Sequence, residues 1–269
     1  MPRSLAICVL TAAFLAAPAA SAQADALRAA VEATTRTETN RARDQYRHPY
    51  ETLAFFGVKP SDTVVEIWPG GGWYTEILAP YLAAGGGKLI LASPEWGRGG
   101  ITKLKAANAT LYGPLTVADF PMFDGKAAEI PAGSADVVLT FRNVHNWRMG
   151  YRRDDKADYS AAAFQQIFTM LKPGGVLGVV DHRLPESASA ERETNSGYIK
   201  TSTVIRLAEQ AGFRLEARSE VNANPKDSAD WPDGVWTLPP SFALQDQDRA
   251  KYAAIGESDR MTLKFVKPR

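Results

Sequence analysis

An acidic residue and a run of glycines stand close together in this chain, and their spacing suggests how they could bind a ligand. Glu66 lies at the end of the apolar, β-branched segment 63–67, and three glycines follow at 70–72. Such a segment is typical of a buried parallel strand, and consecutive glycines allow a tight turn that approaches a ligand closely. A helix over 73–82 would point its free N–H groups into this turn. The pattern predicts a cradle for a nucleotide-like ligand at the carboxyl end of a strand.

Spacing distinguishes the ligands that such a turn could hold. A phosphate-binding P-loop requires Lys-Ser or Lys-Thr after its last glycine, and neither follows here. A dinucleotide-binding turn has Gly-x-Gly-x-x-Gly, but the position three after Gly72 is Thr75. The remaining pattern is Glu66-x-x-x-Gly70-x-Gly72. A tight turn that binds nothing is the alternative interpretation.

Polar and aromatic residues gather in a second place, at 141–147 (Phe-Arg-Asn-Val-His-Asn-Trp). This stretch follows another predicted strand, and such a cluster at a strand end suits a substrate site. His145 is the first candidate for a general base, and His182 is the second. His145 could equally be a hydrogen-bonded residue that caps the strand. For His182, between Asp181 and Arg183, a structural ion pair is the stronger interpretation.

Strands and helices alternate along the chain and would place both clusters at one edge of a sheet. Strands are expected at 63–67, 88–92, 115–118, 136–141, 176–181, 213–221 and 260–266. Helices are expected at 24–40, 49–56, 73–82, 101–109, 159–171 and 202–210. The alternation predicts an α/β, Rossmann-like fold with a doubly wound, mostly parallel seven-stranded sheet whose last strand is antiparallel. The long loop 222–257 between the last two strands could be a lid or a surface covering.

Three segments in this order resemble one known family. They are the glycine turn, Ser-Ala-Asp-Val-Val at 134–138 and Leu-Lys-Pro-Gly-Gly-Val-Leu at 171–177. Together they resemble class I S-adenosylmethionine-dependent methyltransferases. The runs 41–49, 66–70 and 181–183 resemble an exported branch of predicted methyltransferases. The resemblance implies S-adenosylmethionine as cofactor and a small molecule as methyl acceptor.

The resemblance also assigns roles to single residues. Glu66, Gly70 and Gly72 would hold the methionine end of the cofactor. Ser93 stands where the family has an acidic ribose ligand, and Glu95 could reach the ribose instead. The full set implied for the cofactor is Glu66, Gly70, Gly72, Ser93, Glu95, Asp119, Phe120 and Asn143, with Asp119 at the adenine. Trp68 replaces the first glycine of the usual turn, and its indole in the hollow would leave no room for an adenosine.

The first 22 residues have the features of a secretory signal peptide. Arg3 is followed by the apolar run 5–17 and by the small-residue site Ala-Ser-Ala at 20–22. The run is shorter than the roughly 20 apolar residues that span a bilayer, which argues against a membrane anchor. The expected mature chain is one methyltransferase-like domain over 23–269, secreted or periplasmic, with no membrane span.

Composition excludes several kinds of chemistry. The chain has 31 Lys and Arg against 30 Asp and Glu, so its charge balance gives no support for nucleic acid as a partner. Its single cysteine, Cys8, lies within the predicted signal peptide, which leaves no disulfide or thiolate. The three histidines lack the spacing of metal ligands, so no metal is expected.

Two functions remain after this comparison. The first is an exported methyltransferase that acts on a small molecule. The second is a non-catalytic exported protein that binds a small ligand on the same fold, because the cofactor is made in the cytosol. A dehydrogenase fits worst, because the dinucleotide spacing fails.

Overall fold

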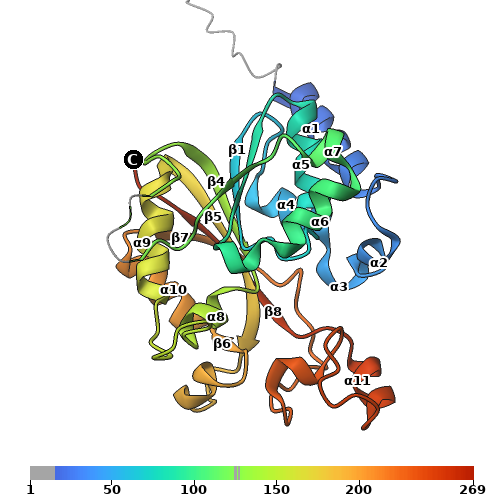
Figure 1. The fold of residues 1–269 in the computed structure, drawn as a ribbon, viewed down its shortest axis with the longest axis vertical. Helices are drawn as coiled ribbons and strands as arrows, with labels where there is room; N and C mark the ends of the chain where they lie inside the picture. The colour runs from blue at the N-terminus through green and yellow to red at the C-terminus, as the bar shows by residue number, and fades with distance from the viewer. Residues whose placement is uncertain (1–15, 124–125, 127) are drawn as a thin grey trace, which may run out of the picture.

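A central sheet organises the part of the chain that the structure describes. The structure, a computed structural model, describes residues 16–123, 126 and 128–269, and side chains from residue 21 onward within these ranges. The strands are β1 (Thr63–Ile67), β2 (Lys88–Ala92), β3 (Thr116–Ala118), β4 (Ala135–Phe141), β5 (Leu171–Leu184), β6 (Ile199–Lys200), β7 (Arg214–Ser219) and β8 (Arg260–Val266). Their order is β3-β2-β1-β4-β5-β8-β7, and β6 pairs with β5 beside this path (Figure 1).

The sheet confirms the predicted α/β, doubly wound architecture. Strands β1 to β5 run parallel, and β8 lies antiparallel between β5 and β7. The described strands number eight rather than seven, because β5 extends to Leu184 and pairs there with the two-residue β6. A strand as short as β6 has too few residues to show an alternating pattern, so periodicity could not predict it.

Helices cover both faces of the sheet. They are α1 (Ala16–Val31), α2 (Glu38–Arg41), α3 (Asp44–Arg47), α4 (Pro49–Phe56), α5 (Thr75–Ala84), α6 (Gly99–Ala107), α7 (Ala109–Tyr112), α8 (Val144–Arg148), α9 (Ser160–Met170), α10 (Thr201–Gln210) and α11 (Arg249–Ile255). Three short 3₁₀ segments are η1 (Glu95–Gly97), η2 (Ala190–Thr194) and η3 (Gly234–Thr237). Helix α5 continues through Pro80 to Ala84.

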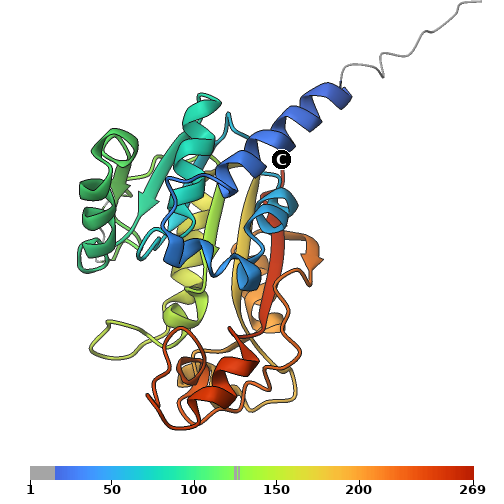
Figure 2. The same cartoon turned by 90° about the vertical axis from the view of Figure 1, so that its right-hand side faces the viewer.

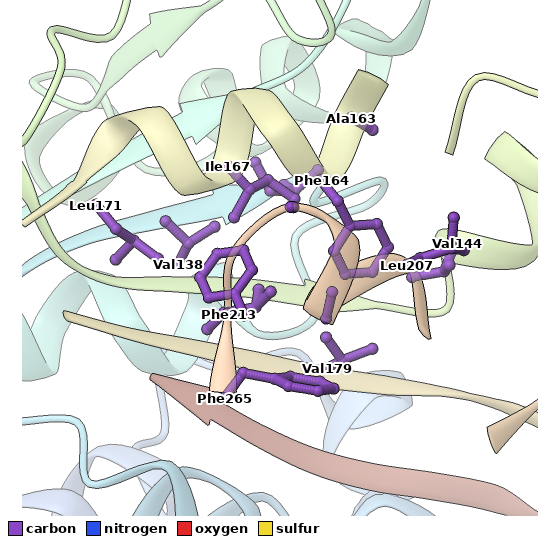
Figure 3. Packing of buried hydrophobic residues seen from close by; sticks show 14 of the residues in the cluster. Val138, Val144, Ala163, Phe164, Ile167, Leu171, Val179, Leu207, Phe213 and Phe265 are labelled. Carbon is purple, nitrogen blue, oxygen red and sulfur yellow. The ribbon is translucent and has the colours of Figure 1, made fainter. Parts of the chain in front are cut away.

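Alternate residues of each strand point to opposite faces of the sheet, and each face has its own buried core. Val138 and Val179 face α9 and α10, where Phe164 and Leu207 complete one core. Figure 3 shows these four residues between the helices and the strands. On the opposite face, the side chains of α1, α4 and α5 pack on the sheet. Burying each large apolar side chain contributes about 1.5–3 kcal/mol, so the two cores hold the strand ends in fixed positions.

The N-terminal segment differs from the predicted single helix. Helix α1 ends at Val31, and the short helices α2 and α3 follow it in place of a continuous helix to residue 40. Helix α1 begins at Ala16 and therefore passes through the predicted cleavage site at 20–22. Residues 1–15 of the predicted signal peptide lie outside the described residues. Among the described residues, none of the helices combines the length and the apolar character needed to cross a bilayer.

The segment 222–257 folds against the end of the sheet where the parallel strands finish. It contains η3 and α11, and it lies at the lower end of the molecule in both views (Figures 1 and 2). Trp231 and Trp236 are partly buried against a small core with Tyr198 and Val235. The segment therefore forms one wall beside the carboxyl ends of the strands.

The crevice for a ligand follows from the strand order. The chain proceeds from β1 outward to β2 and β3, and then returns to β4 on the other side of β1. At such a switch point the connections leave the sheet in opposite directions, and a crevice opens outside the carboxyl ends. Asn143 joins the two strand ends, because its Nδ2 donates to the carbonyl of Ile67 at 2.9 Å.

Candidate active site

A cavity of about 350 Å³ opens at this crevice, beside the ends of β1, β4 and β5. The predicted residues that line it are Glu66, Gly70, Asn143, His145 and His182. Helix α3, the glycine turn and the segment 222–257 supply the remaining walls. The structure thus brings together three of the eight residues predicted for the cofactor and both candidate bases.

The glycine turn adopts the conformation that the sequence suggested. Gly70 has φ +60° and Gly72 has φ +85°, which are values that a side chain rarely permits. A Cβ on Gly72 would lie 2.8 Å from Cδ2 of Leu104. A Cβ on Gly100, at the start of α6, would lie 2.1 Å from the carbonyl oxygen of Gly70. Close packing of α6 therefore fixes the turn from behind and leaves its other side facing the cavity.

Glu66 is a buried carboxyl group at the bottom of this turn. Its side chain accepts a hydrogen bond of 2.6 Å from Oγ1 of Thr75, in the first turn of α5. Burial raises the pKa of Glu66 to about 7, although the Thr75 bond opposes this. A cationic ammonium group in the cavity would favour the ionised carboxylate, so the residue suits the amino group of an amino acid.

We expect Glu66→Gln to remove a pH-dependent loss of stability. The pKa of Glu66 in the folded chain, about 7, lies above the ordinary value of 4.5. The wild type therefore loses stability as the pH rises from 4.5 through 7, by about 3 kcal/mol in total. Urea unfolding at pH 5 and pH 8 should show Glu66→Gln gaining about 2.5 kcal/mol on the wild type between the two, because a small part of the total is already lost at pH 5. An unchanged difference at the two pH values would contradict the buried carboxyl group.

Trp68 occupies the space beside the turn where the other half of the cofactor was expected. Its backbone has φ +46°, and its Nε1 donates to the carbonyl of Phe120 at 2.9 Å. The indole makes edge contacts with Trp147 at 6.1 Å and with Trp96 at 5.1 Å between ring centroids. Trp68 lines both the cavity and an outer groove of about 470 Å³ at Trp96 and Tyr151. The indole therefore separates these two spaces.

The residues predicted for ribose and adenine lie outside the cavity. Asp119 forms an ion pair with Arg98, and its backbone N–H donates to Glu129 at 2.7 Å. Ser93 is buried, with its hydroxyl donating to the adjacent carbonyl of Pro94. The two other residues of this set are Glu95, exposed in η1, and Phe120, buried in the core. The structure does not bring these four side chains together with Glu66.

His145 and Asp181 form a hydrogen-bonded pair at the cavity. Nδ1 of His145 lies 2.6 Å from Oδ1 of Asp181, whose side chain is fully buried. The backbone N–H groups of His145 and His182 also donate to this carboxylate, at 3.1 and 2.8 Å. A carboxylate that accepts these bonds assigns the proton to Nδ1, which leaves Nε2 of His145 free to accept one. This is the arrangement of a general base held in position.

His182 lies next to this pair, and its imidazole stays uncharged. Its ring centroid is 5.0 Å from that of His145, and Nδ1 of His182 bonds Oγ of Ser258 at 2.5 Å. Burial, followed by His145 and nearby arginines, holds the pKa of His182 well below its ordinary value. His182 is therefore neutral, and it makes no ion pair with any residue that the structure describes, unlike the structural role that the sequence favoured.

The convergence of four arginines is the part of the site that the sequence did not predict, although Arg142 belongs to the predicted run 141–147. Arg43, Arg47, Arg142 and Arg260 all line the cavity. Three of them bind the buried carboxylate of Glu257, Arg43 at 2.5 Å and Arg47 at 3.1 Å. Against the effect of its burial, Arg260, Arg47 and Arg43 hold the pKa of Glu257 down to about 2. The dense run of arginines at 41–49 was the available signal, but Arg142 and Arg260 are distant in sequence.

A metal ion is a further ligand to consider here. His145, Asp181 and His182 each offer a ligand atom within 4.8 Å of the others. Asp181, however, is already hydrogen-bonded by His145 and by two backbone N–H groups. The nearby guanidinium groups also repel a cation. The charges of the site therefore favour an anion over a metal.

Comparison with solved structures identifies the fold. A methyltransferase dependent on S-adenosylmethionine from Aquifex aeolicus is 15% identical, with a TM-score of 0.53, 84% of this chain covered and 93% of that one. The 4+2 cyclase SpnF is 14% identical, with a TM-score of 0.57 and coverages of 88% and 85%. A Haemonchus contortus phosphoethanolamine N-methyltransferase 2, solved with S-adenosyl-L-methionine, is 14% identical with a TM-score of 0.51; 90% of this chain and 60% of that one are covered.

The fold is that of class I S-adenosylmethionine-dependent methyltransferases. No model of a protein family matches the sequence, and no curated protein is similar to it. At these low identities the likeness concerns the fold, and one of the similar structures is a cyclase by name. The side chains that line the cavity therefore carry the information about function.

Proposed function

We propose that this chain is an exported S-adenosylmethionine-dependent methyltransferase that acts on a small molecule. The observation that carries the proposal is the glycine turn over Glu66, which opens into the same cavity as the His145–Asp181 pair. A methionine-like ammonium group fits beside the carboxyl group of Glu66. The carboxylate of the same ligand fits the backbone N–H groups of Gly70 and Gly71, which have no hydrogen-bond partner among the described residues. The N–H of Gly72, by contrast, donates to the carbonyl of Pro69. Methyl transfer then needs a positioned acceptor and, for an acceptor that loses a proton, a base.

The adenosine half of the cofactor does not fit while Trp68 keeps its present position. The indole fills the space between the turn and Phe120, and it uses the Phe120 carbonyl as its own hydrogen-bond acceptor. Our proposal therefore requires the Trp68 side chain to leave when the cofactor enters. Its removal would join the cavity to the groove at Trp96, since Trp68 lines both.

Within the proposed reaction, this chain's residues have separate tasks. S-adenosylmethionine supplies the methyl group when it is bound. Nε2 of His145 accepts the proton of an acceptor hydroxyl or amine, and Asp181 stabilises the imidazolium that forms. Neutral His182 cannot compete for this proton, because burial disfavours its charged form.

One observation, the position of the Trp68 indole, favours a second function. If the indole stays in place, the cavity can still bind a small ligand of about amino-acid size without an adenosine. The chain would then be a non-catalytic binding protein on a methyltransferase fold. Binding of S-adenosylmethionine distinguishes the two functions.

The experiment that tests the proposal is a calorimetric titration of the protein with S-adenosylmethionine, with Gly70→Val and Gly86→Val beside it. Both glycines have positive φ, +60° and +76°, and a Cβ would meet no atom within 4 Å at either. Both variants should therefore suffer similar backbone strain, but only Gly70→Val fills the cavity. We expect Gly70→Val alone to lose binding by about a hundredfold. Equal loss in both, or no binding by the wild type at millimolar ligand, would contradict the proposal.

Export by a cleaved signal peptide is the second part of the proposal. The small-residue site at 20–22 supports cleavage after Ala22, which would leave Gln23 as the first residue. The full-length chain should be expressed in a bacterium and its periplasm separated from its cytosol. Intact-mass measurement should then find a chain of residues 23–269 in the periplasmic fraction. A full-length chain that stays in the cytosolic fraction would contradict export.

A further inference from the structure

Four arginines gather on one side of the cavity, and we call Arg43, Arg47, Arg142 and Arg260 the arginine cluster. They come from three distant parts of the chain: around α3, after β4 and at the start of β8. Glu257 is the carboxylate that binds three of them. Within the described part of the chain, no side-chain hydrogen bond or ion pair is present for Arg142.

Several nitrogen atoms of the cluster are buried without an acceptor. Arg47 is 3% exposed and Arg260 is 2% exposed. Among the described residues, Nη2 of Arg47, Nε of Arg260 and Nη2 of Arg43 have no hydrogen-bond partner. A buried polar group without a partner is unfavourable, and a charged one more so. These donors therefore point to an acceptor that the chain itself does not provide.

The surrounding charge favours an anion as this acceptor. At pH 7 all four guanidinium groups are predominantly protonated, so the cluster carries close to four positive charges. Glu257 compensates one of them, and Glu66 is only partly ionised near neutral pH because burial raises its pKa to about 7. Burial lowers the pKa of Arg47 to about 8, and the positive charges of Arg142 and of the other two members of the cluster lower it further, against the opposing effect of Glu257. An added anion would relieve this repulsion.

We propose that the arginine cluster binds an oxyanion, a phosphate or carboxylate group, of the small molecule that accepts the methyl group. Guanidinium groups bind these oxyanions through paired, charge-assisted hydrogen bonds. The cluster shares the cavity with His145, so an anchored anion would hold the rest of the molecule next to the base. Anion binding stands independently of methyl transfer, whereas the role of the anion as acceptor rests on the proposed function.

The test measures anion binding in the absence of cofactor. The protein is titrated with inorganic phosphate and, separately, with malonate as a dicarboxylate, by calorimetry and thermal unfolding, against sodium chloride of equal ionic strength. Arg142→Gln removes the cluster member that no side chain holds, so its folding should be least affected. Arg214→Gln, on exposed β7 and outside the cavity, is the matched control.

We expect at least one of the two oxyanions to raise the unfolding temperature of the wild type and of Arg214→Gln, and chloride to have little effect. Arg142→Gln should weaken its binding about tenfold or more, the loss expected for one charge-assisted hydrogen bond. Arg142→Lys should recover part of this loss. Absence of binding by both oxyanions, or equal binding by Arg142→Gln and Arg214→Gln, would overturn the proposal.

A second titration assigns the anion to acceptor or cofactor. If S-adenosylmethionine binds with unchanged affinity in saturating oxyanion, the two sites are separate, as the proposal requires. Direct competition would show that the cluster holds the carboxylate of the cofactor, and would overturn the acceptor assignment. Oxyanion binding without any binding of S-adenosylmethionine would leave the anion site intact and remove the proposed methyl transfer.

Discussion

Trp68→Gly should raise the affinity for S-adenosylmethionine by about a hundredfold. In the wild type, the cofactor must first displace an indole that packs against Trp147 and donates a hydrogen bond to Phe120. Loss of that packing and hydrogen bond costs about 3 kcal/mol, and the apparent affinity falls by the same free energy. Glycine at this position removes the indole and also suits the observed φ of +46°. Calorimetric titration of both proteins measures the change.

Trp96→Ala is the matched control for this variant. Trp96 contacts the same indole at 5.1 Å, but it is 50% exposed and does not line the cavity. Its removal should change the affinity by less than about threefold, because the cofactor must still displace an indole that is bonded to Phe120 and packed against Trp147. A folded Trp68→Gly variant could instead bind S-adenosylmethionine no more tightly than the wild type does. That result would show that Trp68 does not block the adenosine site.

Glu257→Gln should destabilise the protein by about 3–5 kcal/mol, the usual cost of removing one partner of a buried ion pair. The carboxylate is 2% exposed and binds Arg43, Arg47 and Arg260. Its loss would leave these buried guanidinium groups without their one compensating charge. Urea unfolding at pH 7 measures the difference from the wild type.

The exposed Glu220 provides a control for the loss of an ion pair, and the pH dependence of stability provides a second test of Glu257. Glu220 pairs with Arg183 at 2.7 Å but its side chain is 69% exposed, so Glu220→Gln should cost less than about 1 kcal/mol. Because the pKa of Glu257 is lowered to about 2, its stabilisation is present above pH 4.5 and is lost as the pH falls toward 2. Wild type and Glu257→Gln should therefore converge in acid. A difference that persists unchanged at pH 2 would contradict this electrostatic account.

The sequence predicted the sheet well because its central strands β1 and β4 are buried on both faces. The largely apolar runs that form β1 and β2 agree with the observed strands residue for residue. Glycines at 70 and 72 likewise predicted the turn, since positive φ restricts the choice of residue. Burial and backbone conformation are local properties, and the sequence therefore contains them directly.

The site was less predictable because its decisive contacts join distant residues. Trp68 was recognisable as a departure from the usual glycine, but the direction of its indole depends on Phe120 and Trp147. Asp119 looked available for adenine until the structure paired it with Arg98. The arginine cluster depends on β8 returning Arg260 to the edge of the sheet beside Arg47, which no local pattern indicates.

A crystal structure of the mature protein with S-adenosylhomocysteine tests the central claim most directly. We predict that the amino acid end of the ligand lies over residues 70–72 beside Glu66, and that the indole of Trp68 has left the carbonyl of Phe120. Crystals grown at millimolar ligand that show Trp68 still bonded to Phe120, with no nucleoside in the cavity, would contradict the methyltransferase proposal.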